Sequence, residues 1–187
     1  MILVLCGPKH CGKTSVAGYL HKFIFVDVDF VDTDDLIEKQ NGKSVREIYK
    51  EGADIFKEAE TYALSSALAL AESKGGNLIV ATGGGIADNE QAIAILRGKD
   101  DIKLVYLDVS YETAFKRIML DAGVDGVLPP FLQSAEPAKT HKELHERRSS
   151  LYKKYADLTI NTEGKTVKEI AEAIKASATH GAPFIYV

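Results

Sequence analysis

The stretch GPKHCGKT at residues 7–14 fits the pattern G-x-x-x-x-G-K-[ST] and directly follows the apolar run ILVLC at residues 2–6. The two glycines of the pattern allow a backbone turn that aims successive N–H groups at one anion. Lys13 supplies a point charge for the β- and γ-phosphates of a nucleotide, and the Thr14 hydroxyl takes a position on Mg²⁺. The helix expected next adds a favourable dipole. Because a strand precedes the pattern and a helix follows it, a phosphate site is favoured over a chance match.

Apolar runs alternate with helical patterns along the rest of the chain. We expect strands at residues 2–6, 23–32, 78–81, 102–107 and 158–160, and helices at 13–22, 58–74, 89–97, 111–120, 139–155 and 166–175. Strands that are repeatedly separated by helices predict a parallel sheet with helices on both faces. The fold class is therefore α/β, with three α/β/α layers and a five-stranded parallel sheet. Between residues 120 and 139 the pattern lapses, and a loop of this length is either functional or disordered.

Composition narrows the classes of function. The chain has 187 residues and a formal net charge of −4, and its 45% hydrophobic and 27% charged residues are ordinary for one globular domain over residues 1–187. The mild acidity argues against a nucleic-acid groove, and no apolar run approaches the roughly 18 residues of a membrane span. Cys6 and Cys11 form neither a disulfide framework nor a common zinc pattern. We expect a cytoplasmic protein with no nucleic-acid or membrane partner.

Two carboxylates, Asp32 and Asp34, follow the second expected strand. Ligands of open parallel sheets bind at the carboxyl ends of the strands, and residues i and i+2 of extended backbone share a face. One carboxylate can hold Mg²⁺ through water while the other accepts a substrate hydroxyl and its proton. The alternative is a helix N-cap, because Asp34 and Asp35 precede a helical pattern. Taken alone the two interpretations weigh equally; beside a phosphate loop the site is favoured.

Three further segments follow in order: FKEAE at residues 56–60, ATGGG at 81–85 and RRSSLY at 147–152. Each by itself is more often a solvated helix face or a turn. Together with the phosphate loop and the DTD of residues 32–34, they resemble the shikimate kinases, small P-loop kinases of the nucleoside-monophosphate-kinase type. The resemblance extends from about residue 2 to residue 174.

The resemblance implies a P-loop NTPase fold with a mobile lid at about residues 120–138 and a substrate-binding region at about residues 33–62. It implies ATP and Mg²⁺ as cofactors, catalytic roles for Lys13 and Asp34, and metal roles for Thr14 and Asp32. The nucleotide is expected to contact Gly7, His10, Cys11, Gly12, Lys13, Thr14, Ser15, Arg117 and Lys165. The substrate is expected to contact Asp34, Lys57, Gly83, Gly84, Gly85 and Arg148. In this family scheme Arg117 stacks on adenine, and Arg148 pairs with the substrate carboxylate.

Three positions depart from the family pattern. His10 replaces the middle glycine of the phosphate loop, and Lys57 replaces an arginine, which keeps the charge but loses the planar fork. The family's lid carries R-P-L-L, and Leu128 stands at the arginine that is expected to reach the transferring phosphoryl group. Such arginines contribute about 10³-fold or more. The residues that can substitute from a folded lid are Lys139, His141 and Lys142.

The leading hypothesis is an ATP-dependent kinase that phosphorylates the 3-hydroxyl of shikimate in aromatic amino-acid biosynthesis, and the resemblance implies a monomer. A related P-loop kinase for another polyhydroxy acid is the second hypothesis, favoured by Lys57 and the altered lid. A catalytically weak nucleotide- or shikimate-binding protein is the third, favoured by Leu128. The shikimate-type site predicts that Asp34, Lys57, Gly84 and Arg148 converge on one pocket beside the phosphate loop.

Overall fold

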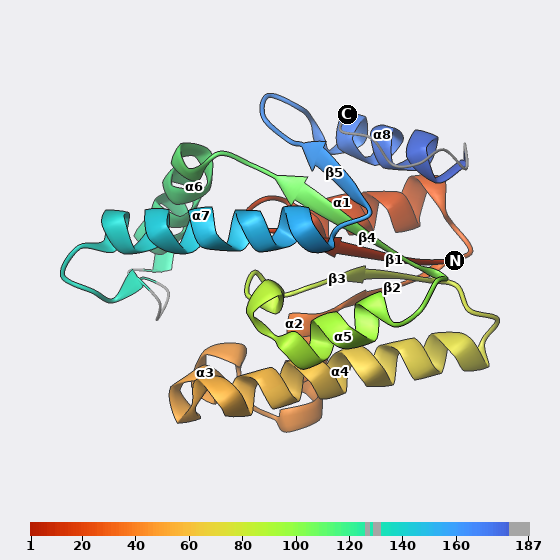
Figure 1. Ribbon diagram of the computed structural model, residues 1–187, viewed down its shortest axis with the longest axis horizontal. Coiled ribbons are helices and arrows are strands. Elements are labelled where there is room, and N and C mark those ends of the chain that lie inside the picture. The colour runs from red at the N-terminus through yellow and green to blue at the C-terminus, as the bar shows by residue number, and fades with distance from the viewer. Residues whose placement is uncertain (126–127, 129–131, 180–187) are drawn as a thin grey trace.

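A five-stranded sheet with all strands parallel forms the centre of the molecule (Figure 1). The computed structural model describes the backbone of residues 1–125, 128 and 132–179. The strands, in their order across the sheet, are β2 (Asp29–Asp32), β3 (Leu78–Ala81), β1 (Ile2–Cys6), β4 (Ile102–Asp108) and β5 (Leu158–Asn161). The expected five-stranded parallel sheet is confirmed.

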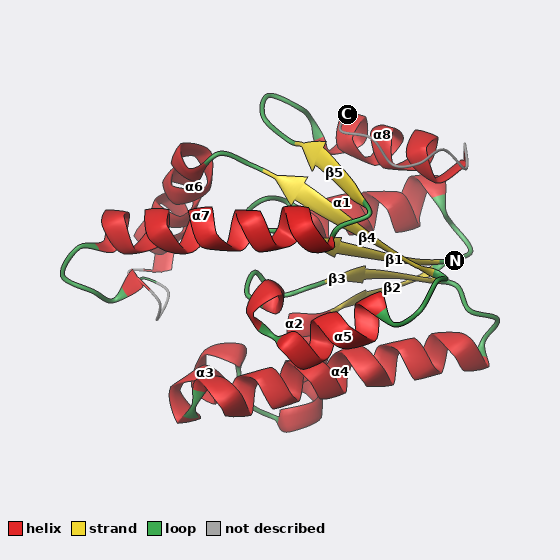
Figure 2. Ribbon diagram, viewed as in Figure 1, coloured by secondary structure: helices red, strands yellow, loops and turns green. Residues whose placement is uncertain are grey.

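Helices cover both faces of this sheet (Figure 2). In chain order they are α1 (Lys13–Tyr19), η1 (Leu20–Ile24), α2 (Thr33–Asn41), α3 (Val45–Glu51), α4 (Ala53–Ser73), η2 (Ile86–Asp88), α5 (Glu90–Arg97), α6 (Tyr111–Asp125), α7 (Pro137–Tyr155) and α8 (Val167–Thr179). In the described part of the chain, none of them is long and apolar enough to cross a membrane.

The core forms on both faces because successive side chains of a strand point to opposite sides. In β1, Val4 packs into a cluster with residues of α4, α5 and α7, while Leu5 packs into a second cluster with residues of α1 and α8. All five residues of β1 are buried, as expected for the central strand of a parallel sheet. A third, smaller cluster joins α2, α3 and α4 through Ile37, Ile48 and Ala63.

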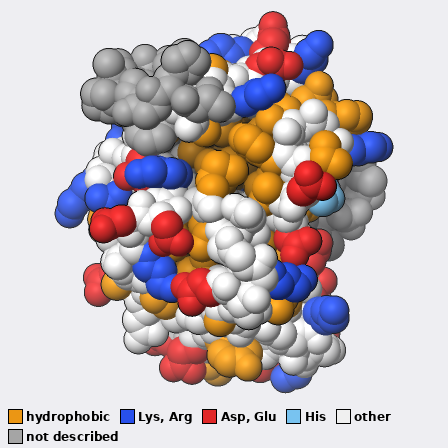
Figure 3. Space-filling view, turned by 90° about the vertical axis from the view of Figure 1, so that its right-hand side faces the viewer, with side chains coloured by type: hydrophobic (Ala, Val, Ile, Leu, Met, Phe, Trp, Pro, Cys, Tyr) orange, Lys and Arg blue, Asp and Glu red, His pale blue; other side chains and the backbone are white. Residues whose placement is uncertain are grey.

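Parallel strands bring three sequence motifs to one edge of the sheet. The register pairs Leu5 of β1 with Ala81 of β3, and Ala81 with Asp32 of β2. The phosphate loop, the DTD segment and the glycine triplet therefore all leave the sheet at its carboxyl edge. The opposite edge faces the viewer in Figure 3, where apolar side chains gather near the centre among charges of both signs.

The second strand is shorter than expected, because the chain continues from α1 as a π-helical turn before β2 begins. The Phe25 N–H donates to the Leu20 carbonyl, and Leu20 and Ile24 pack into the core cluster of α1 and α8. Some β-branched and aromatic side chains of residues 23–28 therefore pack against helices instead of forming a strand, and two others, Phe23 and Val26, are exposed. Tertiary packing overrides strand propensity here.

Two further helices precede α4: α2, which the sequence offered only as the N-cap alternative for the DTD segment, and α3, which it did not predict. Asp32 is the N-cap of α2 and accepts a hydrogen bond from the Asp34 N–H, so the capping interpretation of the DTD segment holds alongside its position at the strand end. Ser44 and Glu47 form a capping box that starts α3. The S-x-x-E spacing is a recognised start signal for a helix, and it could have revealed α3 in the sequence.

Candidate functional site

The phosphate loop has the conformation of an anion cradle. Gly7 and Gly12 adopt φ values of 143° and 102°, which favour glycine, and a Cβ at Gly7 would lie 2.7 Å from the Leu107 carbonyl oxygen. His10 adopts φ 61°, an uncommon value for a residue with a side chain, at the position where the family has glycine. Lys13 is buried and its Nζ donates to the carbonyls of Gly7 and Pro8, each at 2.9 Å. The lysine is thereby held across the loop.

An oxygen pair lies next to this loop. The Thr14 hydroxyl donates to Asp32 Oδ2 at 2.7 Å, which joins the start of α1 to the end of β2. Mg²⁺ in phosphoryl-transfer sites uses one or two protein oxygens together with phosphate oxygens and water. The described residues contain no cluster of three or more His, Cys, Asp or Glu side chains arranged for a metal ion. The Thr14–Asp32 pair therefore fits a magnesium ion brought by a nucleotide.

Four of the residues expected to contact the nucleotide have different surroundings. Arg117 of α6 donates from Nη1 to the His10 carbonyl at 2.9 Å, so its guanidinium lies against the phosphate loop. Cys11 is buried and packs into the core cluster of α1 and α8. Ser15 and Lys165 are exposed, and Lys165 belongs to the turn after β5. Their contacts with a nucleotide remain predictions.

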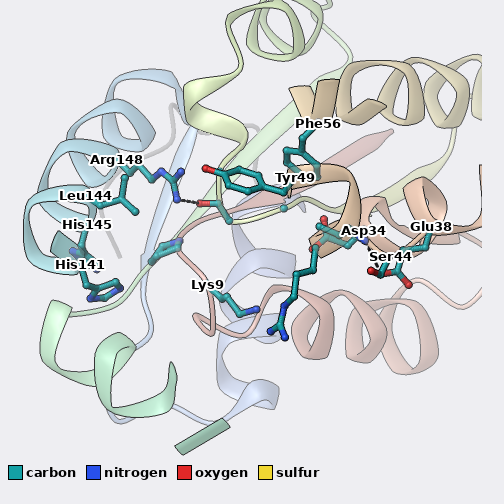
Figure 4. A pocket seen from close by; sticks show the side chains of 16 residues that line it. Lys9, Asp34, Glu38, Ser44, Tyr49, Phe56, His141, Leu144, His145 and Arg148 are labelled. Carbon is teal, nitrogen blue, oxygen red and sulfur yellow. Dashed lines mark hydrogen bonds between the residues drawn. The ribbon is translucent and has the colours of Figure 1, made fainter. Parts of the chain in front are cut away.

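A cavity of about 540 Å³ opens beside the phosphate loop (Figure 4). In Figure 4, Arg148 and His141 of α7 lie on one side, Asp34 and Ser44 lie across from them, and Lys9 of the phosphate loop lies between. The cavity is lined by Pro8, Lys9, Asp34, Glu38, Ser44, Val45, Arg46, Tyr49, Phe56, Gly83, Gly84, Gly85, His141, Leu144, His145 and Arg148. Asp34, the glycine triplet and Arg148 converge as expected.

The glycine triplet is required by close packing. A Cβ at Gly84 would lie 2.8 Å from the backbone nitrogen of Lys9, closer than real Cβ contacts. A Cβ at Gly83 would lie 2.9 Å from Glu60 Oε1 and 3.1 Å from Asp34 Oδ1. The segment therefore brings the phosphate loop and two carboxylates together, which a larger residue would prevent.

The two carboxylates at Gly83 are poised for a polar ligand. Asp34 Oδ1 and Glu60 Oε1 are buried, and neither has a hydrogen-bond partner in the described part of the chain. Burial raises the pKa of Glu60 to about 7, opposed by a hydrogen bond from Asn89 and reinforced by the charge of Asp34. Burial and the neighbouring Asp32 charge likewise raise the pKa of Asp34. Buried acceptors without donors are rare and point to a missing hydroxyl or water.

Arg148 is fixed at the edge of the cavity. Its Nε donates to Asp88 Oδ2 at 2.9 Å and its Nη1 donates to the Gly84 carbonyl at 3.0 Å. The Tyr152 hydroxyl donates to the same carbonyl at 3.0 Å. Asp88 also pairs with Arg147, and these hydrogen bonds keep the pKa of Asp88 low despite its partial burial. The arrangement presents one positioned guanidinium to the cavity.

Lys57 does not join these residues, so the expected convergence is wrong for this lysine. It lines a second, neighbouring cavity with Glu60, Asp88 and Arg148. Phe56, one position earlier on α4, lines both cavities. A helix turns by 100° per residue, so adjacent residues face different directions. Sequence reasoning also missed Arg46, which enters the first cavity from the unexpected helix α3.

The lid region is partly described. Residues 126–127 and 129–131 lie outside the described residues, and the Leu128 carbonyl accepts a hydrogen bond from Gln133 at 3.0 Å. His141 lines the cavity, but burial, with help from His145, lowers its pKa to about 4. His141 is therefore neutral near pH 7, and the expectation that it can replace the lid arginine as a cation is wrong.

The fold and this site define a P-loop kinase. The family model for shikimate kinase matches residues 9–179, so the chain belongs to the shikimate kinase family, as the motifs suggested. The shikimate kinase of Thermobifida fusca is 37% identical over 174 residues, covering 92% of each chain. That of Marinomonas sp. is 32% identical over 173 residues, covering 92% of this chain and 88% of the relative.

A solved structure resembles the whole arrangement. The shikimate kinase from Acinetobacter baumannii in complex with shikimate superposes with a TM-score of 0.78 at 27% identity, covering 93% of this chain and 90% of that one. The P-loop kinase fold inferred from the phosphate loop is thereby confirmed.

Proposed function

We propose that this protein transfers the γ-phosphoryl group of ATP to the 3-hydroxyl of shikimate. The observation that carries the proposal is the convergence of Asp34, the glycine triplet and Arg148 on one cavity next to the phosphate loop. Arg148 offers a guanidinium to a carboxylate, and Asp34 offers an oxygen without a protein partner to a hydroxyl. A small hydroxylated carboxylic acid supplies both groups.

The phosphate loop binds the donor. Its N–H groups and the α1 N-terminus surround the phosphates, and Lys13 holds their charge. Thr14 and Asp32 would hold a magnesium ion, which would supply positive charge against the charge that develops on the phosphate oxygens. Arg117 lies against the same loop, where its guanidinium can stack on the adenine.

Asp34 orients the acceptor and takes its proton. The hydroxyl oxygen forms a bond to the γ-phosphorus while the bond to the bridging oxygen breaks, and ADP leaves with that electron pair. The hydroxyl proton passes to Asp34, whose raised pKa makes it a better acceptor than an ordinary aspartate. The neutral His141 and Leu144 line the cavity and help to exclude water around the reacting groups.

A coupled assay of ADP release with shikimate, gluconate and simple sugars tests this proposal. We expect turnover that depends on shikimate and falls roughly 10²- to 10⁴-fold in Asp34→Asn, because a positioned base contributes about that much. Asp35→Asn is the matched control: it makes the same substitution one residue along, on an exposed side chain. Equal losses in both variants would contradict the role of Asp34.

A kinase for another polyhydroxy acid is the second candidate. It is favoured by the position of Lys57 outside the cavity and of Arg46 inside it, which changes the cationic lining. Turnover with gluconate or a sugar, but not with shikimate, would select it. ATP binding measured by calorimetry, without turnover on any acceptor, would select a binding protein with weak catalysis. We also infer a cytoplasmic monomer, which light scattering after size-exclusion chromatography tests for oligomeric state.

A further inference from the structure

Arg46 differs from the other arginines of this chain. Four of the five arginines donate hydrogen bonds to protein groups, and these are Arg97, Arg117, Arg147 and Arg148. For Arg46 the described part of the chain provides neither a hydrogen bond nor an ion pair, although its side chain is half-buried and lines the cavity. A guanidinium in a cavity without a protein acceptor is available to a ligand.

The local structure gives no other reason for an arginine at this position. Arg46 lies in the first turn of α3, where the helix dipole disfavours a cation. The nearby carboxylates are occupied: Glu47 accepts hydrogen bonds from the backbone and hydroxyl of Ser44, and Glu38 accepts one from the Val45 N–H. A residue that conflicts with its local structure often marks a functional site.

The place of Arg46 indicates which anion it meets. Asp34 and Ser44, the residue that caps α3, lie together across the cavity from Arg148 (Figure 4). Lys9 of the phosphate loop borders the same cavity. Arg148 enters the cavity from α7, whereas Arg46 enters it from α3, two residues after the cap Ser44 that lies beside Asp34. The anion that the proposed reaction brings between the phosphate loop and Asp34 is the transferring phosphoryl group.

The lid sequence supplies no guanidinium for that group. Leu128 stands at the lid position of the family's arginine, and the sequence has no arginine between Arg117 and Arg147. The side chains of Lys139 and Lys142 are exposed and lie 3.6 Å and 3.9 Å from the carboxylates of Glu136 and Glu146. His141 is neutral near pH 7.

We propose that Arg46 is a catalytic residue of the kinase reaction, stabilising the charge on the transferring phosphoryl group from α3, on the side of the cavity away from α7. The inference rests on the proposed function and adds the residue that replaces the lid arginine. As the acceptor oxygen bonds to phosphorus and ADP leaves, charge spreads over the three equatorial oxygens of that group. A guanidinium that donates to them lowers the barrier without strengthening the binding of the acceptor.

Steady-state kinetics of Arg46→Ala with ATP and shikimate test the proposal. We expect kcat to fall roughly 10²- to 10³-fold, with the KM for shikimate changed less than about threefold. Arg46→Lys should recover part of kcat, because lysine retains the charge but not the fork. Lys50→Ala is the matched control, since it removes one positive charge from the same helix at an exposed position outside the cavity, and it should leave kcat unchanged.

Thermal unfolding separates catalysis from structure. Because Arg46 has no protein partner among the described residues and lies at a disfavoured helix position, Arg46→Ala should unfold at the same temperature as the parent protein or slightly above it. A lower unfolding temperature that accounts for the lost activity would overturn the proposal. So would an unchanged kcat, or a raised KM at unchanged kcat, which would assign Arg46 to the acceptor carboxylate.

The same measurements separate this inference from the proposed function. If the parent protein phosphorylates shikimate and Arg46→Ala is equally fast, the Arg46 inference fails while the substrate stands. If the parent protein phosphorylates only another acceptor, the proposal that shikimate is the substrate is wrong. The role of Arg46 is then decided by comparing the kcat of the parent protein with that of Arg46→Ala, using that acceptor. If the parent protein has no kinase activity, both proposals fail.

Discussion

The phosphate loop and the acceptor cavity are adjacent, yet their polar groups are in opposite states. On the loop side Lys13 donates to two carbonyls, and Thr14 donates to Asp32. In the acceptor cavity, Asp34 Oδ1 and Arg46 lack partners within the described residues. Lys13 and Thr14 are thus held by protein groups, whereas Asp34 Oδ1 and Arg46 are available to a ligand.

This difference coincides with the departures from the family pattern. The loop side has the lysine, threonine and aspartate that phosphoryl transfer requires, and its one departure, His10, adopts left-handed backbone. On the acceptor side Leu128 stands at the lid position of the expected arginine, Lys57 lines the second cavity, and Arg46 lines the first. Replacing a residue within a hydrogen-bond network leaves its protein partners without a hydrogen bond. Replacing a residue whose only partner is the ligand leaves the protein's own hydrogen bonds intact.

Among the substitutions that follow, the largest effect should come from removing the charge of the phosphate loop. Lys13→Ala removes the charge that lies across the phosphate loop, and we expect kcat to fall by about 10²- to 10³-fold. The coupled ADP-release assay measures this loss. Lys22→Ala, an exposed lysine in η1, should change nothing. A Lys13 variant that retains most of its kcat would show that the loop side is less essential than its geometry indicates.

A smaller loss of activity should come from forcing the phosphate loop and the glycine triplet apart. Gly84→Ala places a Cβ within 2.8 Å of the Lys9 nitrogen, so the loop or the triplet must shift. We expect roughly 10- to 100-fold lower kcat/KM and about 1–3 kcal/mol lower stability. Activity assays and chemical denaturation measure the two quantities.

Gly18→Ala is the control for that substitution. Gly18 lies within α1, and a Cβ there meets nothing within 4 Å. Alanine should therefore stabilise the helix by roughly 0.5–1 kcal/mol and leave activity intact. If both variants behaved alike, close packing at Gly84 would not be the reason for the triplet.

The smallest effect concerns the pH dependence of stability on the acceptor side. Folded Glu60 keeps its proton up to about pH 7, whereas an unfolded glutamate loses its proton near the ordinary pKa of 4.5. Between these values the folded state binds the extra proton, so raising the pH from about 5 to 7 lowers the free energy of unfolding. The full decline is on the order of 3 kcal/mol. Glu60→Gln cannot ionise and should lack it.

Urea denaturation at several pH values measures this decline as the difference between the parent protein and Glu60→Gln. The difference removes the contribution of His141, whose lowered pKa makes stability rise with pH between about 4 and 6.5. Glu58→Gln, an exposed position on the same helix, should follow the parent protein. Parallel curves for the parent protein and Glu60→Gln would exclude proton uptake by Glu60.

Local spacing explains what could be predicted. The phosphate loop depends on consecutive residues whose backbone encloses one anion, and the alternation of strands and helices follows from hydrophobic period. Because parallel strands end at one edge, the sequence also placed the loop, Asp32 and the glycine triplet together. The prediction of a strand at residues 23–28 was wrong, because apolar composition does not distinguish a strand from the packed end of a helix and the turn after it.

The amino-acid sequence by itself determined the fold class, the phosphate loop and the acidic and glycine segments beside it, because each depends on neighbouring residues. Only the tertiary structure decided which cations face the acceptor. The rotation of α4 about its axis directs Lys57 into the second cavity, and the packing of α2, α3 and α4 brings Arg46 into the first. Such rotations depend on contacts between helices distant from the residue, and no local pattern encodes them.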